Sequence, residues 1–292
     1  KNSAKILFDA MRPRQWIKNL LIFVNVLMAH QLSDIALMTS TMAAFFAFCL
    51  CASAVYLMND LFDLDADRKH SSKRFRAFAS GSLELIYGIV AAPVLLLVAF
   101  LLAVIAGGAF PLALLVYFAA TVLYSLILKR IVILDVLVLA MLYTLRIVAG
   151  ASVAVVMPSF WLMSFAMFIF GSLAMAKRYA ELKMLETQDI TWASGRGYHV
   201  GDLVLISSLG VSSGYIAILV LALYVNSPDV LVLYHNVNFI WLLCPLLMYW
   251  IGRIWLLASR GILDQDPVIF ATRDPVSYLV GFFSLLILWA AT

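Results

Sequence analysis

Charged residues are scarce in this chain, at 12% of 292 residues, whereas 65% are apolar. An average soluble domain carries roughly a quarter charged residues, and burial in one globular core does not account for so many apolar ones. The shortage of charge therefore excludes a soluble globular enzyme and a disordered chain. The apolar runs lack the strict alternation of apolar and polar residues that barrel strands require, which argues against a β-barrel.

Cysteines and linker residues are also few. The three cysteines, Cys49, Cys51 and Cys244, lie in apolar runs without a Cys-x-x-Cys spacing. This excludes a disulfide-rich secreted module, and we interpret the thiols as small core residues. No Gly/Ser/Pro-rich stretch divides the chain. We therefore expect an all-α fold, a polytopic membrane bundle, as a single transmembrane domain over residues 1–292.

The chain contains long apolar runs. Its mean hydropathy is +1.02, and several runs approach the ~20 residues that cross a bilayer as a helix. The sequence predicts nine transmembrane helices, at roughly 16–33, 40–58, 86–107, 109–127, 132–152, 160–176, 203–225, 236–256 and 275–291.

The basic residues segregate to one side of these spans. With nine spans, 19 of the 20 lysines and arginines fall on the side of the N-terminus, and the twentieth, Arg146, falls inside the fifth span. The opposite side carries only Asp34 and Asp229 among charged residues. The positive-inside rule makes the basic side cytoplasmic. The sequence thus predicts a multi-pass protein of the cytoplasmic (inner) membrane, with a cytoplasmic or interfacial N-terminal segment at 1–15.

An acidic stretch follows the second span. Asp60, Asp63 and Asp67 are spaced i, i+3, i+7, which places the three carboxylates on one face if the second span continues as a helix. Carboxylate oxygens suit Mg²⁺, which typically binds a few carboxylates together with substrate phosphates. A solvated acidic helix end is the alternative, although aspartate is a poor helix former.

A basic run comes immediately after the acids. It comprises Arg68, Lys69, Lys73, Arg74 and Arg76. Carboxylates that hold a metal, followed by bases that hold phosphate oxygens, suit a Mg²⁺–diphosphate ligand. Membrane topology or contact with anionic lipid is the alternative explanation for these bases.

The acidic stretch resembles the first aspartate-rich motif, N-D-x-x-D-x-x-x-D, of the UbiA superfamily of membrane prenyltransferases. Asn59, Asp60, Asp63 and Asp67 match it, and nine spans with the motif just after the second fit the same family. The resemblance implies a UbiA-like bundle whose cytoplasmic active-site loops lie at 59–81 and 177–200, with the active site on the cytoplasmic face.

The second motif departs from the family pattern. Typical members carry D-x-x-x-D after the sixth span and bind a second Mg²⁺ there, whereas this chain has Lys177 and Glu181 at the two acidic positions. Because a lysine cannot ligate Mg²⁺, we expect this loop to bind anions in place of a second metal.

The stretch Lys177–Leu182 is similar to one branch of the superfamily, the decaprenyl-phosphate phosphoribosyltransferases. Other segments agree with that branch: Arg12–Asn19, Tyr124–Ser125, Lys129–Arg130, Leu134–Val136, Leu145–Arg146 with Ala149–Gly150, and Asp266–Ala271 with Arg273–Asp274.

This resemblance implies a reaction. Members of the branch transfer 5-phosphoribose from phosphoribosyl diphosphate (PRPP) to a polyprenyl phosphate and release diphosphate, making a precursor of arabinose donors for cell-envelope glycans. The donor and acceptor bring three anionic groups, which suits one acidic cluster with many bases. No general base is needed, because a lipid phosphate is already ionised at neutral pH.

The resemblance also implies residue roles. Asp60, Asp63 and Asp67 would be the catalytic residues and would hold one Mg²⁺ on the donor diphosphate. Lys177 and Arg178 would contact the C5 phosphate. The other expected substrate contacts are Lys18, Lys73, Arg74 and Lys129 for diphosphate or acceptor phosphate, Glu181 for ribose hydroxyls or a neighbouring base, and Asn19, Asn59, Tyr124, Arg130, Asp135 and Arg146.

Two charged residues lie within the fifth predicted span. An arginine inside a span is costly and usually faces the bundle interior or water. Arg146 and Asp135 are eleven residues apart, on a similar helical face. They would therefore line a polar cavity, or else make buried structural contacts such as Arg146 to helix carbonyls.

Two other functions compete with the phosphoribosyltransferase. One is an aromatic prenyltransferase that uses an isoprenyl diphosphate, against which the altered second motif argues. The other is a transporter, against which the one-sided polar cluster and the lack of an inverted repeat argue. The expected partners are PRPP, the polyprenyl phosphate and the membrane. A homo-oligomer is left open, and nucleic acid is not expected.

Overall fold

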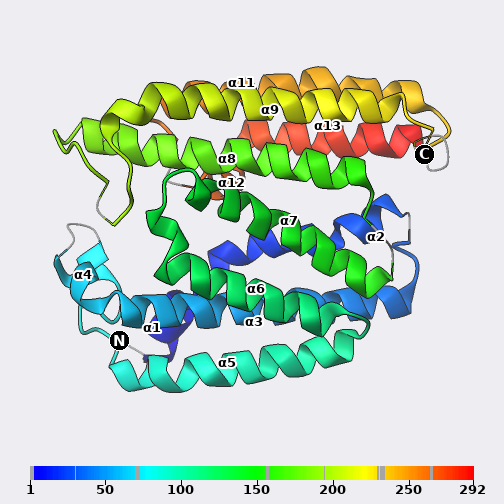
Figure 1. The fold of residues 1–292 in the computed structure, drawn as a ribbon. Helices are drawn as coiled ribbons and strands as arrows, with labels where there is room; N and C mark the ends of the chain where they lie inside the picture. Colours follow the sequence, from blue (N-terminus) through cyan, green and yellow to red (C-terminus); the bar gives the residue numbers. More distant parts are fainter. Residues whose placement is uncertain are drawn as a thin grey trace. The chain divides into compact units, whose positions relative to one another are not determined.

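The computed structural model describes residues 3–29, 31–69, 73–155, 158–193, 195–228, 230, 234–263 and 266–292. Apart from one isolated bridge between Trp192 and His199, this part of the chain consists of helices, turns and loops. The all-α prediction is therefore confirmed (Figure 1).

The helices carry the labels of Figure 1, and η marks 3₁₀ segments. They are α1 (Ser3–Ala10), η1 (Pro13–Phe23), α2 (Val24–Met28), α3 (Ile35–Phe62), α4 (Leu64–Lys69), η2 (Lys73–Phe75), α5 (Leu85–Ala106), α6 (Phe110–Leu126), η3 (Leu128–Arg130), α7 (Leu134–Ala154), α8 (Phe160–Glu186), η4 (Val200–Asp202), α9 (Leu203–Val225), η5 (Val237–Leu242), α11 (Leu243–Ser259), α12 (Pro267–Ala271) and α13 (Pro275–Ala291).

Six helical segments in the described residues are long and apolar enough to cross a membrane. They are Ile35–Phe62, Leu85–Ala106, Leu134–Ala154, Phe160–Glu186, Val200–Val225 and Val237–Ser259. Phe110–Leu126 and Pro275–Ala291 are shorter apolar helices. The chain is thus a multi-pass membrane protein, whereas the count of nine spans stays a prediction. The first predicted span, 16–33, coincides with η1 and α2 rather than with one α-helix.

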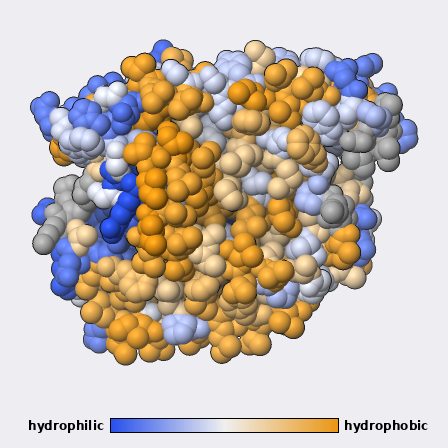
Figure 2. All heavy atoms as spheres, viewed as in Figure 1, coloured by the Kyte–Doolittle hydropathy of each residue, from blue (hydrophilic) through white to orange (hydrophobic). Residues whose placement is uncertain are grey.

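Large apolar side chains cover the outside of these helices. On α5, Leu97, Leu101, Val104 and Ile105 are all more than half exposed and recur at helical spacing. Figure 2 shows hydrophobic side chains across the middle of the visible face and hydrophilic ones near its edges. Contiguous apolar surface of this extent is expected where lipid, not water, covers a helix.

The chain forms two compact units. Unit 1 comprises Lys1–Leu126 with Leu145–Met157, and unit 2 comprises Ile127–Thr144 with Pro158–Thr292. Helix α7 is shared, because its first half belongs to unit 2 and its second half to unit 1. The prediction of a single domain stays a prediction.

Unit 1 is organised around α3, which packs along α5 (Figure 1). Gly88 of α5 permits this approach, because a Cβ there would lie 3.2 Å from the Leu61 side chain of α3 and 2.6 Å from the Phe78 ring. Helix α1 joins the same core, where Ala10 is buried with Leu57 of α3 and with Phe78. The amphipathic N-terminal helix is thereby fixed beside the end of α3, where the acidic stretch begins.

Unit 2 is organised around α8, which packs along α9 and α11 (Figure 1). Gly210 and Gly214 of α9 face this contact, since a Cβ on Gly210 would lie 2.2 Å from the Trp255 ring of α11. The indole N–H of Trp255 donates to the Ser172 hydroxyl of α8 at 3.0 Å. A polar contact thus fixes the register of two membrane helices inside an apolar core.

The last helix, α13, is capped at its N-terminus by the carboxylate of Asp274. Asp274 accepts the Ser277 backbone N–H at 2.9 Å and the Ser277 hydroxyl at 2.8 Å. Two guanidinium nitrogens of Arg253 in α11 also donate to it, at 2.6 and 2.8 Å. Burial raises the pKa of Asp274, but the hydrogen bonds from Arg253 and Ser277 outweigh burial, so the net pKa is lowered.

This cap predicts a pH dependence. A carboxyl whose pKa is lowered by folding contributes stability that is complete above its unfolded pKa of about 3.9 and is lost as the pH falls through the folded pKa. We expect Asp274→Asn to cost about 1.5–3 kcal/mol at pH 7, the range for hydrogen bonds to charged groups. Thermal unfolding of both proteins at pH 7, 5 and 3 measures this. The difference in stability between the wild type and Asp274→Asn should become smaller below pH 4. A stability difference that is the same at all three pH values would contradict the predicted linkage.

Candidate functional site

The acidic stretch lies where α3 ends. The helix stops at Phe62, Asp63 is its C-terminal cap residue, and α4 begins at Leu64. The backbone N–H of Asp67 still bonds to the carbonyl of Asp63 at 2.8 Å. The second span therefore does not run on as one helix, yet Asp60 and Asp67 are both buried.

The two buried carboxylates converge on one arginine. Nitrogen NH1 of Arg76 donates to Asp67 at 2.7 Å and to Asp60 at 3.2 Å. Arg76 directly follows η2, and its guanidinium lies against the two acids. The convergence predicted from the i, i+7 spacing is thus present for Asp60 and Asp67. The metal-ligand role of Asp60, Asp63 and Asp67 stays a prediction.

A second arginine reaches Asp60 from the other side. Nitrogen NH2 of Arg12 donates to Asp60 at 2.5 Å, and the Arg12 guanidinium lies 4.8 Å from the centre of the Tyr56 ring. Arg12 connects α1 to η1 with a left-handed backbone, φ 56° and ψ 58°. A non-glycine residue there costs free energy, so side-chain contacts compensate for an unfavourable backbone.

Sequence reasoning included Arg76 in the basic run and Arg12 in a segment similar to the branch, but it gave neither a substrate contact of its own. Instead it selected Lys73 and Arg74, which the structure places in η2 with exposed side chains. Arg74 lies over the Phe75 ring. Nothing in the spacing of the basic run distinguishes position 76, because the contact depends on the turn after α4.

The acidic pair fits a hard cation. No group of three His, Cys, Asp or Glu side chains within the described ranges is arranged to hold a metal. However, two buried carboxylate oxygens already share one cationic nitrogen of Arg76. Oxygen donors of this kind are the ligands that Mg²⁺ prefers, together with substrate phosphates. Asp60 and Asp67 would hold such an ion, with Asp63 between them in sequence.

A cavity of about 640 Å³ opens beside the pair. Its polar lining comes from α1, from the end of α3 and from the turn after η2, and it includes Lys5, Asp9, Arg12, Asp60 and Arg76. Such a volume is in the range of small-molecule sites. Unit 1 therefore contains a cavity with charged and apolar lining residues, and Asp60 of the first motif lies in its wall.

A second polar cluster of unit 1 surrounds Arg146. Its Nε donates to the Asn19 side-chain oxygen at 2.9 Å, and NH2 donates to the Tyr117 hydroxyl at 2.8 Å. Asn19 in turn donates to the Cys49 sulfur at 3.3 Å. Arg146, Asn19 and the nearby Lys18 are all buried. The structure thus brings two expected residues together and adds Tyr117, which carried no sequence signal.

Four other residues that were expected to contact substrate are less buried than Arg146 and Asn19. Asn59 in α3 and Tyr124 in α6 are half-buried, and in η3 Lys129 is half-buried while Arg130 is exposed. Their contacts with substrate stay a prediction.

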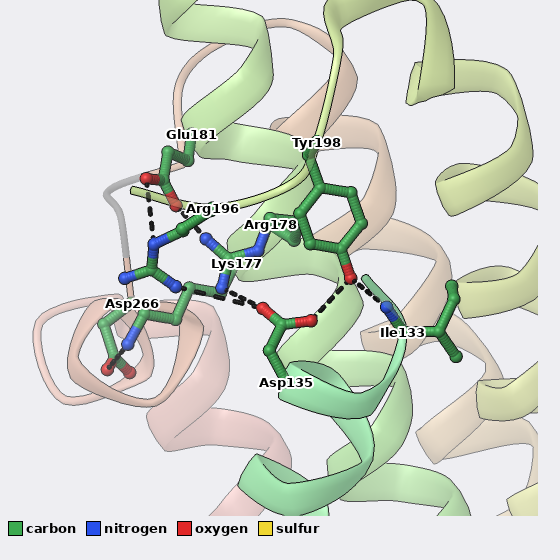
Figure 3. Close-up of polar contacts among 8 residues, drawn as sticks. All are labelled: Ile133, Asp135, Lys177, Arg178, Glu181, Arg196, Tyr198 and Asp266. Carbon is green, nitrogen blue, oxygen red and sulfur yellow. Dashed lines mark hydrogen bonds and ion pairs between the residues drawn. The ribbon is translucent and has the colours of Figure 1, made fainter. Parts of the chain in front are cut away.

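Unit 2 contains a buried ion network (Figure 3). Asp135, at the start of α7, and Arg178, in α8, are both 0% exposed, and their carboxylate and guanidinium lie 2.5 Å apart. Arg178 also pairs with Glu181, one turn later in α8. A fully buried charge is tolerated only when it is paired and hydrogen-bonded, so Arg178 is held by two acids inside unit 2.

The loop before α9 completes this network. Tyr198 donates its hydroxyl hydrogen to Asp135 at 2.5 Å, and the same oxygen accepts the Ile133 backbone N–H at 2.8 Å. Arg196 pairs with Glu181 at 3.5 Å and with Asp135 at 3.9 Å. Burial and the Asp135 carboxylate raise the pKa of Tyr198, which keeps the phenol protonated. The loop is thereby tied to α7 and α8.

Lys177 points to a different partner. Its ammonium lies 3.4 Å from Asp266, the residue that also caps α12, and both side chains are partly exposed (Figure 3). Lys177 and Glu181, which stand at the two acidic positions of the second motif, therefore both form ion pairs with other side chains of the protein. Arg196 and Tyr198 are further members that sequence reasoning missed, because only the folded loop brings them to Asp135.

The chain is thus a helical membrane protein with three polar clusters, and the carboxylate and arginine cluster of unit 1 suits an anionic ligand. Comparison with known proteins makes the class specific. The chain belongs to the UbiA prenyltransferase family, whose family model matches residues 20–290.

Relatives of this chain include proteins with different names. An uncharacterized protein y4nM of Sinorhizobium fredii is 39% identical over 93% of this chain and 53% of its own length. Nodulation protein NoeC of Azorhizobium caulinodans is 35% identical over 93% of this chain and 90% of its own. Decaprenyl-phosphate phosphoribosyltransferase of Mycolicibacterium smegmatis is 37% identical over 64% of this chain and 60% of its own. The chain therefore spans about half of the first relative and three fifths of the third.

Solved structures share the fold at low sequence identity. A UbiA homolog from Archaeoglobus fulgidus bound to GPP and Mg²⁺ aligns with a TM-score of 0.70 at 16% identity, covering 97% of this chain and 96% of that one. A digeranylgeranylglyceryl phosphate synthase aligns with a TM-score of 0.68 at 13% identity, covering 100% and 99%. The predicted UbiA-like fold is confirmed.

Proposed function

We propose that the protein transfers 5-phosphoribose from PRPP to a polyprenyl phosphate and releases diphosphate. The observation that carries this proposal is the state of Glu181, the one acid left in the second motif. Glu181 pairs with Arg178 and Arg196, and Lys177 stands at the other acidic position, so this motif has one carboxylate where a second Mg²⁺ site would need two. A donor that needs two metal-binding acidic motifs is disfavoured, and a donor with one diphosphate and a separate phosphate is favoured.

The reaction balances without a general base. The bond between ribose C1 and the diphosphate oxygen breaks, and the diphosphate leaves with the bonding electron pair. An ionised oxygen of the lipid phosphate forms the new bond to C1. A Mg²⁺ ion bound with the donor would neutralise the charge that develops on the leaving diphosphate. Asp60, Asp63 and Asp67 are the residues we propose to hold it.

The basic residues have complementary proposed roles. Arg12 and Arg76 lie at the acids and line the cavity of unit 1, so they suit contacts with diphosphate oxygens. Lys177, at the edge of the unit 2 network and partly exposed, suits the C5 phosphate. Arg178 is enclosed between two acids, which favours positioning of the network over direct phosphate contact.

The relatives support this proposal in part. The phosphoribosyltransferase of M. smegmatis shares 37% identity with the aligned part of this chain, whereas y4nM and NoeC align over more of it under other names. We propose the cytoplasmic membrane as the location, with the pocket on the cytoplasmic face, from the segregation of basic residues. The product would serve as a cell-envelope glycolipid precursor.

A transfer assay tests the proposal. The purified protein in detergent receives polyprenyl phosphate, Mg²⁺ and PRPP labelled in the ribose, and label is followed into the organic phase. We expect label to enter lipid and EDTA to stop it. If an intact protein supplied with lipid moves no label, the ribosyl reaction is wrong. Geranylgeranyl diphosphate with aromatic acceptors is then the next pair, because a UbiA homolog binds GPP with Mg²⁺.

A further inference from the structure

We propose that Arg12 and Arg76 are exchangeable counter-ions of the acidic pair, so that divalent metal and diphosphate each strengthen the binding of the other to unit 1. Each guanidinium pairs with carboxylates in the ligand-free protein. On binding, the metal takes over the carboxylates and the released guanidinium groups take the phosphate oxygens. The inference rests on the metal–diphosphate part of the proposed function, and it does not depend on which group is transferred.

The first support is that two buried carboxylates lie close together and need a cation between them. Asp60 and Asp67 are 4% and 2% exposed. Two buried carboxylates this close repel each other unless a cation lies between them. Nitrogen NH1 of Arg76 is that cation, since it contacts both acids within 3.2 Å. The guanidinium therefore supplies the positive charge that a metal held by these acids would supply in its place.

The second support is that both arginine side chains are partly exposed and lie beside the cavity. The side chains of Arg12 and Arg76 are 30% and 28% exposed, and both line the cavity of unit 1. Each guanidinium group therefore already borders the cavity in which an anion would bind. Guanidinium groups suit both partners, since they bind carboxylate and phosphate oxygens with similar geometry.

The charge balance makes the two ligands interdependent. Two carboxylates and two guanidinium groups leave the cluster close to neutral. A divalent metal alone would displace two cations and leave them beside it without partners. A diphosphate alone would meet arginines already neutralised by carboxylates. When both ligands arrive together, the metal offsets the two carboxylates and the two guanidinium groups offset two charges of the diphosphate, which is a positive coupling between the two binding events.

The coupling predicts opposite effects of one substitution on the two ligands. In Arg76→Gln, Asp67 loses its guanidinium partner and becomes accessible to metal, while the site loses one phosphate ligand. We expect Mn²⁺ alone, measured by electron paramagnetic resonance, to bind about 10-fold more tightly than to the wild type. We expect labelled pyrophosphate with saturating Mg²⁺ to bind at least about 10-fold more weakly, each a change of about 1.4 kcal/mol.

The matched controls are in the same protein. Arg14→Gln changes an exposed arginine two positions from Arg12, and it should leave both affinities unchanged. Arg12→Gln should act as Arg76→Gln does, more weakly for the metal because Arg76 still contacts both acids. Thermal unfolding of each variant in detergent shows that it is folded, and Arg76→Lys provides a second substitution if Arg76→Gln does not fold.

The outcomes separate the inference from the reaction. If Arg76→Gln and Arg12→Gln weaken both ligands, or change neither, the arginines are structural and the inference is overturned. If Mn²⁺ and pyrophosphate bind the wild type independently of each other, it is overturned as well. If the coupling and the opposite shifts are found, the inference holds even where the transfer assay with PRPP moves no label, and only the choice of donor is then wrong.

Discussion

Replacing Asp60 by asparagine is expected to lower the rate of group transfer by at least about 100-fold, the scale of losing a charged group at a preorganised site. Asp60 is the acid that both Arg12 and Arg76 contact, and asparagine keeps its size while removing its charge. The two remaining acids, Asp63 and Asp67, would hold a metal more weakly, and two guanidinium groups would lose a partner. Initial rates of label transfer to lipid at saturating Mg²⁺ measure the effect.

The matched control is Asp65→Asn. Asp65 belongs to the same acidic stretch, but its side chain is 92% exposed and lies 3.9 Å from Arg68. We expect its activity to stay within about twofold of the wild type, since exposed ion pairs contribute little. A similar loss in both variants would mean that the stretch acts through its overall charge. Near-normal transfer by Asp60→Asn would remove the metal role assigned to this acid.

Replacing Asp135 by asparagine is expected to lower the free energy of unfolding by about 3–5 kcal/mol, the cost of leaving a buried charge without its partner. Asp135 is fully buried, it pairs with the fully buried Arg178, and it accepts the Tyr198 hydroxyl. The neutral side chain would leave Arg178 to Glu181 alone. Thermal unfolding of the purified protein in detergent, followed by intrinsic fluorescence, measures the loss.

Two further variants calibrate this result. Tyr198→Phe removes one hydrogen bond to the same carboxylate and should cost about 1–3 kcal/mol, because a buried acceptor loses a donor. Glu186→Gln breaks an exposed pair with Lys183 in α8, where about 0–1 kcal/mol is expected. If Asp135→Asn were as mild as Glu186→Gln, the network would be a surface-like contact and not the support of the loop before α9.

Much of the fold follows from the apolar runs. The spans predicted at 86–107, 109–127 and 203–225 differ by at most two residues from α5, α6 and α9. Hydropathy did not predict where α3 and α8 end, because both helices continue past the apolar run into polar residues. Helix α8 continues from the predicted end at 176 to Glu186, because alanine, leucine, lysine, arginine and glutamate are good helix formers whether or not lipid surrounds them.

The site was predictable where the chemistry is local in sequence. The spacing of Asp60 and Asp67 indicates their convergence, which the shared contact with Arg76 bears out. The arginine partners were not predictable, because Arg12 is 48 residues from Asp60 and reaches it only after α1 docks through Ala10. The same holds for Tyr198, 63 residues from Asp135. Periodicity reports one helix at a time, whereas these contacts depend on how helices and loops pack.

The 3₁₀ geometry of η1 changes how far the first apolar segment reaches. A 3₁₀ helix rises about 2.0 Å per residue against about 1.5 Å for an α-helix. The eleven residues Pro13–Phe23 therefore extend roughly 22 Å, and the five residues of α2 add about 7 Å. The hydrocarbon core of a bilayer is about 30 Å thick. Sixteen residues wound in this way have nearly the reach of a twenty-residue α-helix, so a stretch too short for the α-helical rule is long enough to span the hydrocarbon.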